Sequence, residues 1–110
     1  MKIKKVRIGK RVIEAEVCDN YLSQLKGLMF RRDKRPLLFV FKNKGLRAIH
    51  SFFCMRFLAI WFADNEIIDA KFVEPWSYNI VPKREFDKLL EVPFDSENEL
   101  SGLSSVIRKI

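Results

Sequence analysis

The alternation of apolar and charged residues at the start of the chain predicts a β-hairpin. Apolar residues at positions 6, 8, 13, 15 and 17 alternate with charged residues on both sides of Gly9-Lys10. A period of two is typical of half-buried strands, and a two-residue link containing Gly is typical of a tight turn between them. Ile3 and Val12 fall off this alternation, which blurs the ends of both strands.

The period changes after Asp19. Four apolar residues recur at spacings of three and four behind an Asp19-Asn20 cap, which predicts one early helix over residues 21–29. A basic stretch follows and ends at Pro36, so we expect an exposed loop there.

The remaining apolar runs are strand-sized and stand between turn signals. They predict strands at 37–41, 49–53, 58–63, 67–73 and 89–92, a helical turn at 96–100 and a last strand at 106–108. Asp64-Asn65-Glu66 is expected to be a hairpin turn. The pattern therefore favours an α+β, mainly β fold: a small antiparallel or barrel-like sheet with one early helix, in a single globular domain over residues 1–110.

Composition narrows the class of protein. With 110 residues, 48% apolar and 32% charged, the chain is too hydrophobic for disorder. No apolar run approaches the roughly 18 residues of a spanning helix, and no signal-peptide pattern follows the basic N-terminus, so a cytoplasmic location is expected. Cys18 and Cys54 are then expected to be free thiols.

The net charge of +7 is unevenly distributed along the chain. Residues 1–56 carry fifteen Lys and Arg against four Asp and Glu, whereas residues 57–110 carry six against ten. Such a basic half can bind an anionic partner, although a solvated basic surface has the same composition. Nucleic acid is one alternative for that partner, but no recognised nucleic-acid motif is present.

Five short motifs occur in a characteristic order. They are Gly27-Leu28-Met29-Phe30-Arg31, Leu38-Phe39-Val40-Phe41, Ile49-His50-Ser51-Phe52-Phe53, Phe62-Ala63-Asp64 and Val73-Glu74-Pro75-Trp76. Together they resemble the uncharacterised domain-of-unknown-function family number 192, in its archaeal form, over about residues 5–92. The resemblance implies a small, mostly β domain with an early helix and no established reaction.

The chain departs from that family pattern at two positions. The family typically carries a Pro, and two residues later an Asp, just before the apolar strand. Phe57 and Ala59 stand in those places here. The resemblance therefore implies that an acid of the family has been lost from this chain.

His50 and Cys54 are the residues with the most obvious chemistry. If residues 49–53 are a strand, the rise of about 3.3 Å per residue places the side chains of His50 and Cys54 ~13 Å apart. That distance is too long for the two residues to share a metal ion, unless the chain turns between them. His50 is a candidate general base, or alternatively a histidine satisfied by backbone hydrogen bonds. We predict no metal, no cofactor and no catalytic residue, because Walker, GxGxxG, GxSxG and HExxH motifs are absent.

Four residues are candidates for ligand binding: Arg31, His50, Trp61 and Trp76. Arg31 can reach an anionic ligand, or alternatively pair with an acid such as Asp64 or Asp69. Trp61 and Trp76 can stack on a ligand, although aromatic residues in strands more often form the core.

Three functional hypotheses remain. The first is a non-enzymatic module that binds an anionic or protein partner through its basic surface, at residues 2–11 and 31–47. The second is a small-ligand-binding or enzymatic pocket around His50 and Arg31. The third is an accessory subunit that dimerises through a sheet edge or the Trp76 region.

Overall fold

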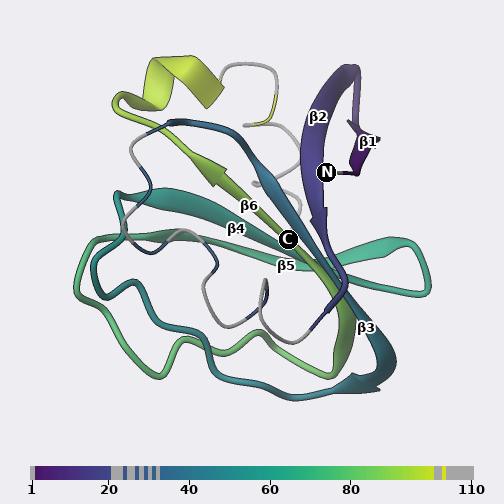
Figure 1. The fold of residues 1–110 in the computed structure, drawn as a ribbon. Helices are drawn as coiled ribbons and strands as arrows, with labels where there is room; N and C mark the ends of the chain where they lie inside the picture. Colours follow the sequence, from purple (N-terminus) through teal and green to yellow (C-terminus); the bar gives the residue numbers. More distant parts are fainter. Residues whose placement is uncertain are drawn as a thin grey trace.

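The computed structural model describes residues 2–20, 24, 27, 29, 31, 33–100 and 103, and these residues form a six-stranded sheet (Figure 1). The strands lie in the order β1-β2-β3-β6-β4-β5. Their bounds are β1 (Ile3–Ile8), β2 (Arg11–Cys18), β3 (Leu37–Gly45), β4 (Phe57–Ala63), β5 (Glu66–Val73) and β6 (Phe86–Pro93), and a short 3-10 helix, η1 (Glu97–Leu100), follows. The mainly β prediction is confirmed.

The sheet is mixed and open, so the expectation of an antiparallel or barrel-like sheet was wrong in its details. β2 pairs with β3 in parallel, with Glu16 opposite Leu37 and Cys18 opposite Phe39, while the other pairs are antiparallel. A parallel pair needs a long connection rather than a tight turn, and residues 19–36 provide it. β1 and β5 are the two edges of the sheet.

The predicted early helix is not borne out. Most of residues 21–29 lie outside the described residues, and of the described ones among them only Gln24 is in an α-helical conformation. Gln24 is described, and its amide donates to the carbonyl of Asn20 at 3.1 Å. The strand predicted at 106–108 also lies outside the described residues.

Both predicted hairpins are confirmed, and their turns explain the choice of residues. Gly9 takes a φ of 60° in the two-residue link between β1 and β2. Asp64 and Asn65 take φ values of 51° and 67° between β4 and β5. Two successive residues with positive φ define the type I′ turn that matches strand twist, and Asp and Asn tolerate this conformation better than most residues.

β4 is buried along its whole length because both faces of the sheet carry an apolar core. Leu58, Ile60 and Phe62 pack into one core with the hairpin of β1 and β2 and with Leu100. The alternate residues of β4, including Ala59 and Trp61, pack into the second core. A strand buried on both faces needs apolar residues at every position, which explains the uninterrupted apolar run of β4.

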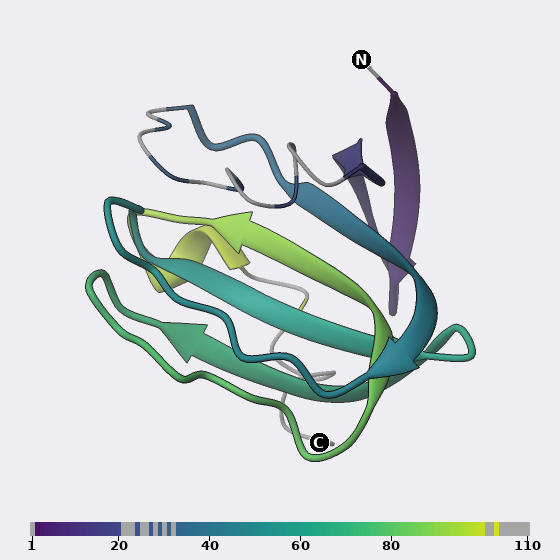
Figure 2. The ribbon, with the colours of Figure 1, turned by 60° about the horizontal axis from the view of Figure 1, so that its bottom comes forward.

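Two long connections cover the second core. They follow β3 and β5 and run beside each other, as Figures 1 and 2 show. Their contact is an isolated antiparallel bridge in which the amide of Ile49 donates to Ile80 at 2.9 Å and the amide of Ile80 donates back at 3.1 Å. This pairing positions the segment that carries His50.

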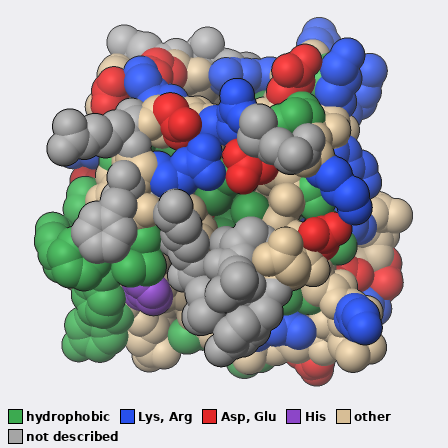
Figure 3. Space-filling view, viewed as in Figure 1, with side chains coloured by type: hydrophobic (Ala, Val, Ile, Leu, Met, Phe, Trp, Pro, Cys, Tyr) green, Lys and Arg blue, Asp and Glu red, His purple; other side chains and the backbone are tan. Residues whose placement is uncertain are grey.

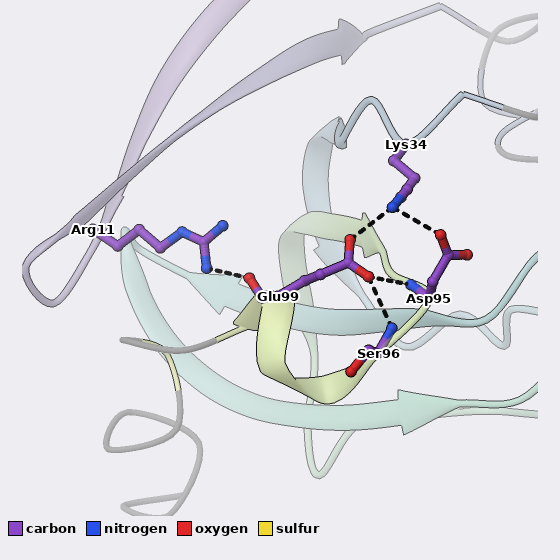
Figure 4. Close-up of polar contacts among 5 residues, drawn as sticks. All are labelled: Arg11, Lys34, Asp95, Ser96 and Glu99. Atoms are coloured by element: carbon purple, nitrogen blue, oxygen red, sulfur yellow. Dashed lines mark hydrogen bonds and ion pairs between the residues drawn. The ribbon is translucent and has the colours of Figure 1, made fainter.

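The helical turn predicted at 96–100 is confirmed as η1, and one carboxylate holds it in place (Figure 4). The Glu99 carboxylate accepts the backbone amides of Asp95 and Ser96, each at 2.8 Å, as in a capping box. It also pairs with Lys34 at 2.8 Å, and Arg11 donates to the Glu99 carbonyl at 2.8 Å. Three segments distant in sequence therefore meet at Glu99. The hydrogen bond from Lys34, followed by those from the Ser96 and Asp95 amides, lowers the pKa of Glu99 to about 2.

The register of the first hairpin can be tested at two neighbouring positions. Ile13 is 5% exposed and packs in the core, whereas Val12 is 46% exposed. We expect Ile13→Ala to lower the free energy of unfolding by about 2–4 kcal/mol and Val12→Ala to change it by about 0.5 kcal/mol or less, as measured by urea denaturation. Equal losses in the two variants would contradict this register.

Candidate functional site

The segment around His50 turns sharply and is not the strand that its apolar residues predicted. After the bridge at Ile49 the chain enters a turn at Phe52 and Phe53, with Phe53 at a φ of 61°. The pattern failed because Ser51, and not the aromatic residues beside it, points into the protein. The turn brings His50 and Cys54 onto the wall of one pocket, whereas an extended strand would hold their side chains ~13 Å apart.

Ser51 joins the two long connections. It is fully buried, and its hydroxyl donates to the carbonyl of Glu74 at 2.5 Å and accepts the amide of Ser77 at 2.8 Å. Its own amide donates to the Ser77 carbonyl at 2.9 Å, while its carbonyl accepts the amides of Cys54 and Trp76, each at 3.1 Å. One small polar residue therefore fixes both loops relative to each other.

An aromatic rim, consisting of Phe52, Phe53, Trp76 and Tyr78, projects from these loops. The ring of Phe53 meets that of Trp76 edge to face at 4.8 Å, and the ring of His50 stacks on that of Phe52 at 5.1 Å. Figure 3 shows a hydrophobic patch on the surface with the histidine beside it. Trp76, like Phe53, has a positive φ, of 65°, a strained conformation for a bulky residue and one that is concentrated at functional sites.

Beside this rim lies a pocket of about 220 Å³, which we call the Glu91 pocket. Its walls come from the His50 loop, from β3 and β6, and from the connection after β2. The described residues that line it are Gln24, Gly27, Met29, Phe39, Ala48, Ile49, His50, Cys54 and Glu91. His50 therefore belongs both to the pocket wall and to the stack on the rim.

Glu91 is the unusual residue of this pocket. It sits in β6, opposite Leu37 of β3 and Ala59 of β4, and its residue surface is 5% exposed. Within the described part of the chain it has no ion pair. Burial disfavours the charged carboxylate and raises the pKa of Glu91 to about 8, so the side chain is mainly neutral at pH 7.

The position of Glu91 changes the interpretation of Ala59. Ala59 holds the place where the family resemblance implies an acid, and it lies directly across the strands from Glu91. A carboxyl group is therefore present at this level of the sheet, supplied by the neighbouring strand. Glu91 was missed as a candidate, although an acid within the apolar run Leu89-Leu90-Glu91-Val92 was a visible signal.

The other polar groups of the pocket are held by local hydrogen bonds. Nδ1 of His50 accepts the amide of Phe52 at 3.2 Å, and the thiol of Cys54 donates to the Phe52 carbonyl at 3.4 Å. Burial, with a smaller contribution from the charge of Glu91, raises the pKa of Cys54 to about 11, so this thiol is a poor nucleophile at neutral pH. The side-chain amide of Gln24 donates to the carbonyls of Cys18 and Val40, at 3.1 and 2.9 Å, which holds residue 24 against the sheet.

The structure brings His50 and Trp76 close to each other through Phe52 but does not bring Arg31 or Trp61 to the pocket. Trp61 is fully buried in the second core, edge to face with Phe86. Arg31 pairs with Glu16 at 3.5 Å and with Asp33 at 3.2 Å. Its partners are therefore neither Asp64 nor Asp69, the acids considered from sequence.

Many basic residues of the first half also make ion pairs. The pairs are Lys2 with Asp19, Lys34 with Asp95 and Glu99, Arg35 with Glu16, and Lys44 with Asp64. Lys4, Lys5 and Arg7 on β1 make no ion pair among the described residues. With Lys88 and Asn65 they line a groove of about 190 Å³, which we call the β1-edge groove.

The described residues offer neither a metal centre nor a membrane-spanning helix. No three His, Cys, Asp or Glu side chains there lie close enough together to hold a metal ion. No helix in that part of the chain has the length and apolarity needed to cross a membrane.

Comparison with known proteins identifies relatives of this chain. The model of domain-of-unknown-function family 192, described as "Uncharacterized ACR", matches residues 4–101. UPF0127 protein PF1050 of Pyrococcus furiosus is 30% identical over 90 residues, which are 77% of each chain. UPF0127 protein PH1112 of Pyrococcus horikoshii is 26% identical over 84 residues, 73% of this chain and 72% of that protein. The archaeal resemblance is confirmed.

Two crystal structures share the fold. A Sinorhizobium meliloti protein described as a putative transcription regulator matches with a TM-score of 0.71 and 18% identity, over 89% of this chain and 83% of the other. A Novosphingobium aromaticivorans protein of unknown function matches with a TM-score of 0.69 and 18% identity, over 89% and 76%. At this level of identity the likeness is one of fold.

The burial of Glu91 makes a testable contribution to stability. In the unfolded chain Glu91 ionises near its ordinary pKa of 4.5, whereas in the folded protein it keeps its proton up to about pH 8. Between these values the unfolded state binds fewer protons than the folded state. The free energy of unfolding should therefore fall as pH rises, by up to about 1.4 kcal/mol for each increase of one pH unit. We expect Glu91→Gln to remove this fall between pH 5 and pH 8 in urea denaturation.

Glu14→Gln is the matched control, since Glu14 is an exposed residue of β2. This variant should keep the decline with pH seen in the wild type. An unchanged pH dependence in the Glu91→Gln variant would show that Glu91 is ionised in the folded protein.

Proposed function

Because the chain belongs to domain-of-unknown-function family 192, an uncharacterised family, we propose its function from the geometry of its own pocket: it is a non-catalytic module that binds a small molecule in the Glu91 pocket. The proposal moves the expected ligand site from His50 and Arg31 to His50 and Glu91. We propose that it acts in the cytoplasm, which agrees with its two free cysteines.

One observation carries this proposal. A carboxyl group from a central strand lines a cavity of about 220 Å³ and has no ion pair among the described residues. Burying such a group costs free energy unless a hydrogen bond or an opposite charge compensates it. Convergent polar groups in an otherwise apolar cavity are typical of ligand sites. The rim held by Ser51 supplies a preorganised entrance beside it.

The arrangement favours binding over catalysis. Cys54 keeps its proton at neutral pH, and Nδ1 of His50 is already occupied by a backbone amide. A nucleophile next to a base is the usual signature of covalent catalysis, and the hydrogen bonds of these two side chains in the described part of the chain go to the backbone of Phe52 and not to each other.

A blocking substitution tests the pocket. Ala48 lines the pocket and is exposed, so Ala48→Trp should fill the entrance without disturbing the core. In amide NMR spectra titrated with a library of small fragments, we expect ligands that shift residues 48–50, 54 and 91 in the wild type and lose at least tenfold in affinity in the variant.

Val12→Trp is the control, because it adds the same side chain at an exposed position of β2. It should bind the fragments as the wild type does. The pocket proposal fails if no fragment shifts these amides, or if Ala48→Trp leaves binding unchanged.

A second candidate function rests on the β1-edge groove. Among the described residues, Lys4, Lys5 and Arg7 remain without ion pairs on an edge strand, whereas many other basic residues of the first half are paired. This cluster of basic side chains supports the binding of an anionic partner at β1. The site is smaller than the basic surface expected from the sequence.

Salt dependence tests the second candidate. If the three side chains contact phosphates, binding of oligothymidylate measured by anisotropy should weaken with salt, and replacing all three with Gln should reduce the log–log slope by about 2, since each contact contributes about 0.7 for single strands. Replacing the ion-paired Lys2, Lys44 and Arg56 with Gln removes the same charge and should change the slope less. Equal effects of the two triple variants would assign binding to net charge alone.

A further inference from the structure

The described walls of the Glu91 pocket carry an acid but no Lys or Arg. The chain has 21 Lys and Arg, yet none of them is among the described residues that line this pocket. Glu91 is the only carboxylic acid among the described residues that line the pocket. The described walls therefore offer one acid and no strong base to a ligand.

Among the described residues, no charged side chain pairs with the carboxyl group of Glu91. Its neighbours on the adjacent strands are Leu37 and Ala59, both completely buried and apolar. A carboxylate removed from water is stabilised most by an opposite charge within hydrogen-bonding distance. A cation entering the pocket would supply what these neighbours do not.

The remaining walls suit a short apolar group attached to that cation. Phe39 presents an aromatic ring, and Met29 and Cys54 present polarisable sulfur atoms. A cavity of about 220 Å³ is smaller than the roughly 300–1,000 Å³ of drug-sized sites, so it fits a molecule of few heavy atoms.

We propose that the ligand of the Glu91 pocket is a small organic cation, a primary ammonium with a short apolar tail, which pairs with the carboxylate of Glu91. This inference rests on the proposed function and specifies its ligand class. The ammonium group lies against Glu91 and the tail lies among Phe39, Met29 and Cys54.

Binding releases one proton. The free pocket holds Glu91 mainly as the neutral acid at pH 7, since burial raises its pKa to about 8. When the ammonium enters, the O–H bond of Glu91 breaks, the proton passes to solvent, and the carboxylate and the ammonium form the ion pair. Affinity should therefore rise about tenfold from pH 6 to pH 7, about fivefold from pH 7 to pH 8, and level off above.

Two other titratable groups face this site. The Cys54 thiol stays neutral in this range, because burial raises its pKa to about 11. His50 lies on the pocket wall, and its contribution can be removed by His50→Gln. The strands beside β6 place only Leu37 and Ala59 directly opposite Glu91. The pH profile should therefore persist in the His50→Gln variant.

Three probes of equal chain length separate the alternatives: butylammonium, 1-butanol and butyrate. In amide NMR titrations we expect butylammonium to shift residues 48–50, 54 and 91 and to bind at least tenfold more tightly than the other two. Glu91→Gln should remove this preference. Calorimetry in two buffers with different ionisation enthalpies should detect proton release on binding at pH 7.

The outcomes distinguish the ligand class from the pocket itself. If butanol or butyrate binds as well as butylammonium, the cation is wrong and the pocket function stands. The same conclusion follows if the affinity for butylammonium is independent of pH in the wild type, a test that does not require any variant to fold. If no probe and no fragment shifts the pocket amides, the pocket function fails and the cation with it.

Discussion

The insertion of β6 between β3 and β4 is the constraint on which the structure depends. This strand supplies the middle of the sheet, and both of its neighbours are apolar and buried at the level of Glu91. A carboxyl group in that position is shielded from bulk water and has no polar partner across the strands to stabilise its charge. The two-sided core and the chemistry of the Glu91 pocket therefore have the same origin.

The local sequence pattern was sufficient to predict the strands of the sheet. The period of two, the turn residues Gly9 and Asp64-Asn65, and the uninterrupted apolar run of β4 each depend on neighbours in sequence. The arrangement of the strands could not be predicted in this way, because the parallel pair of β2 and β3 and the insertion of β6 depend on contacts between distant residues. The predicted strand at 49–53 failed for a related reason: Ser51 bonds to a loop more than twenty residues away.

The candidate site was only partly visible in the sequence. His50 and Trp76 were identified because they are chemically distinctive, and the structure connects them through Phe52. Arg31 and Trp61 were equally distinctive but are held by an ion-pair network and by the core. Glu91 could have been suspected as an acid in an apolar run, but only the structure shows that it lines a pocket.

The central place of β6 also determines when the fold can be completed. β3 and the β4–β5 hairpin precede β6 in the chain, and neither can join the other until residues 86–93 arrive between them. During synthesis on the ribosome, β3 and β4 each carry an unpaired edge until β6 has been made. Unpaired strand edges are prone to pairing with other chains. The step that completes the sheet is the same step that buries Glu91, so the pocket and the cooperative fold come into existence together.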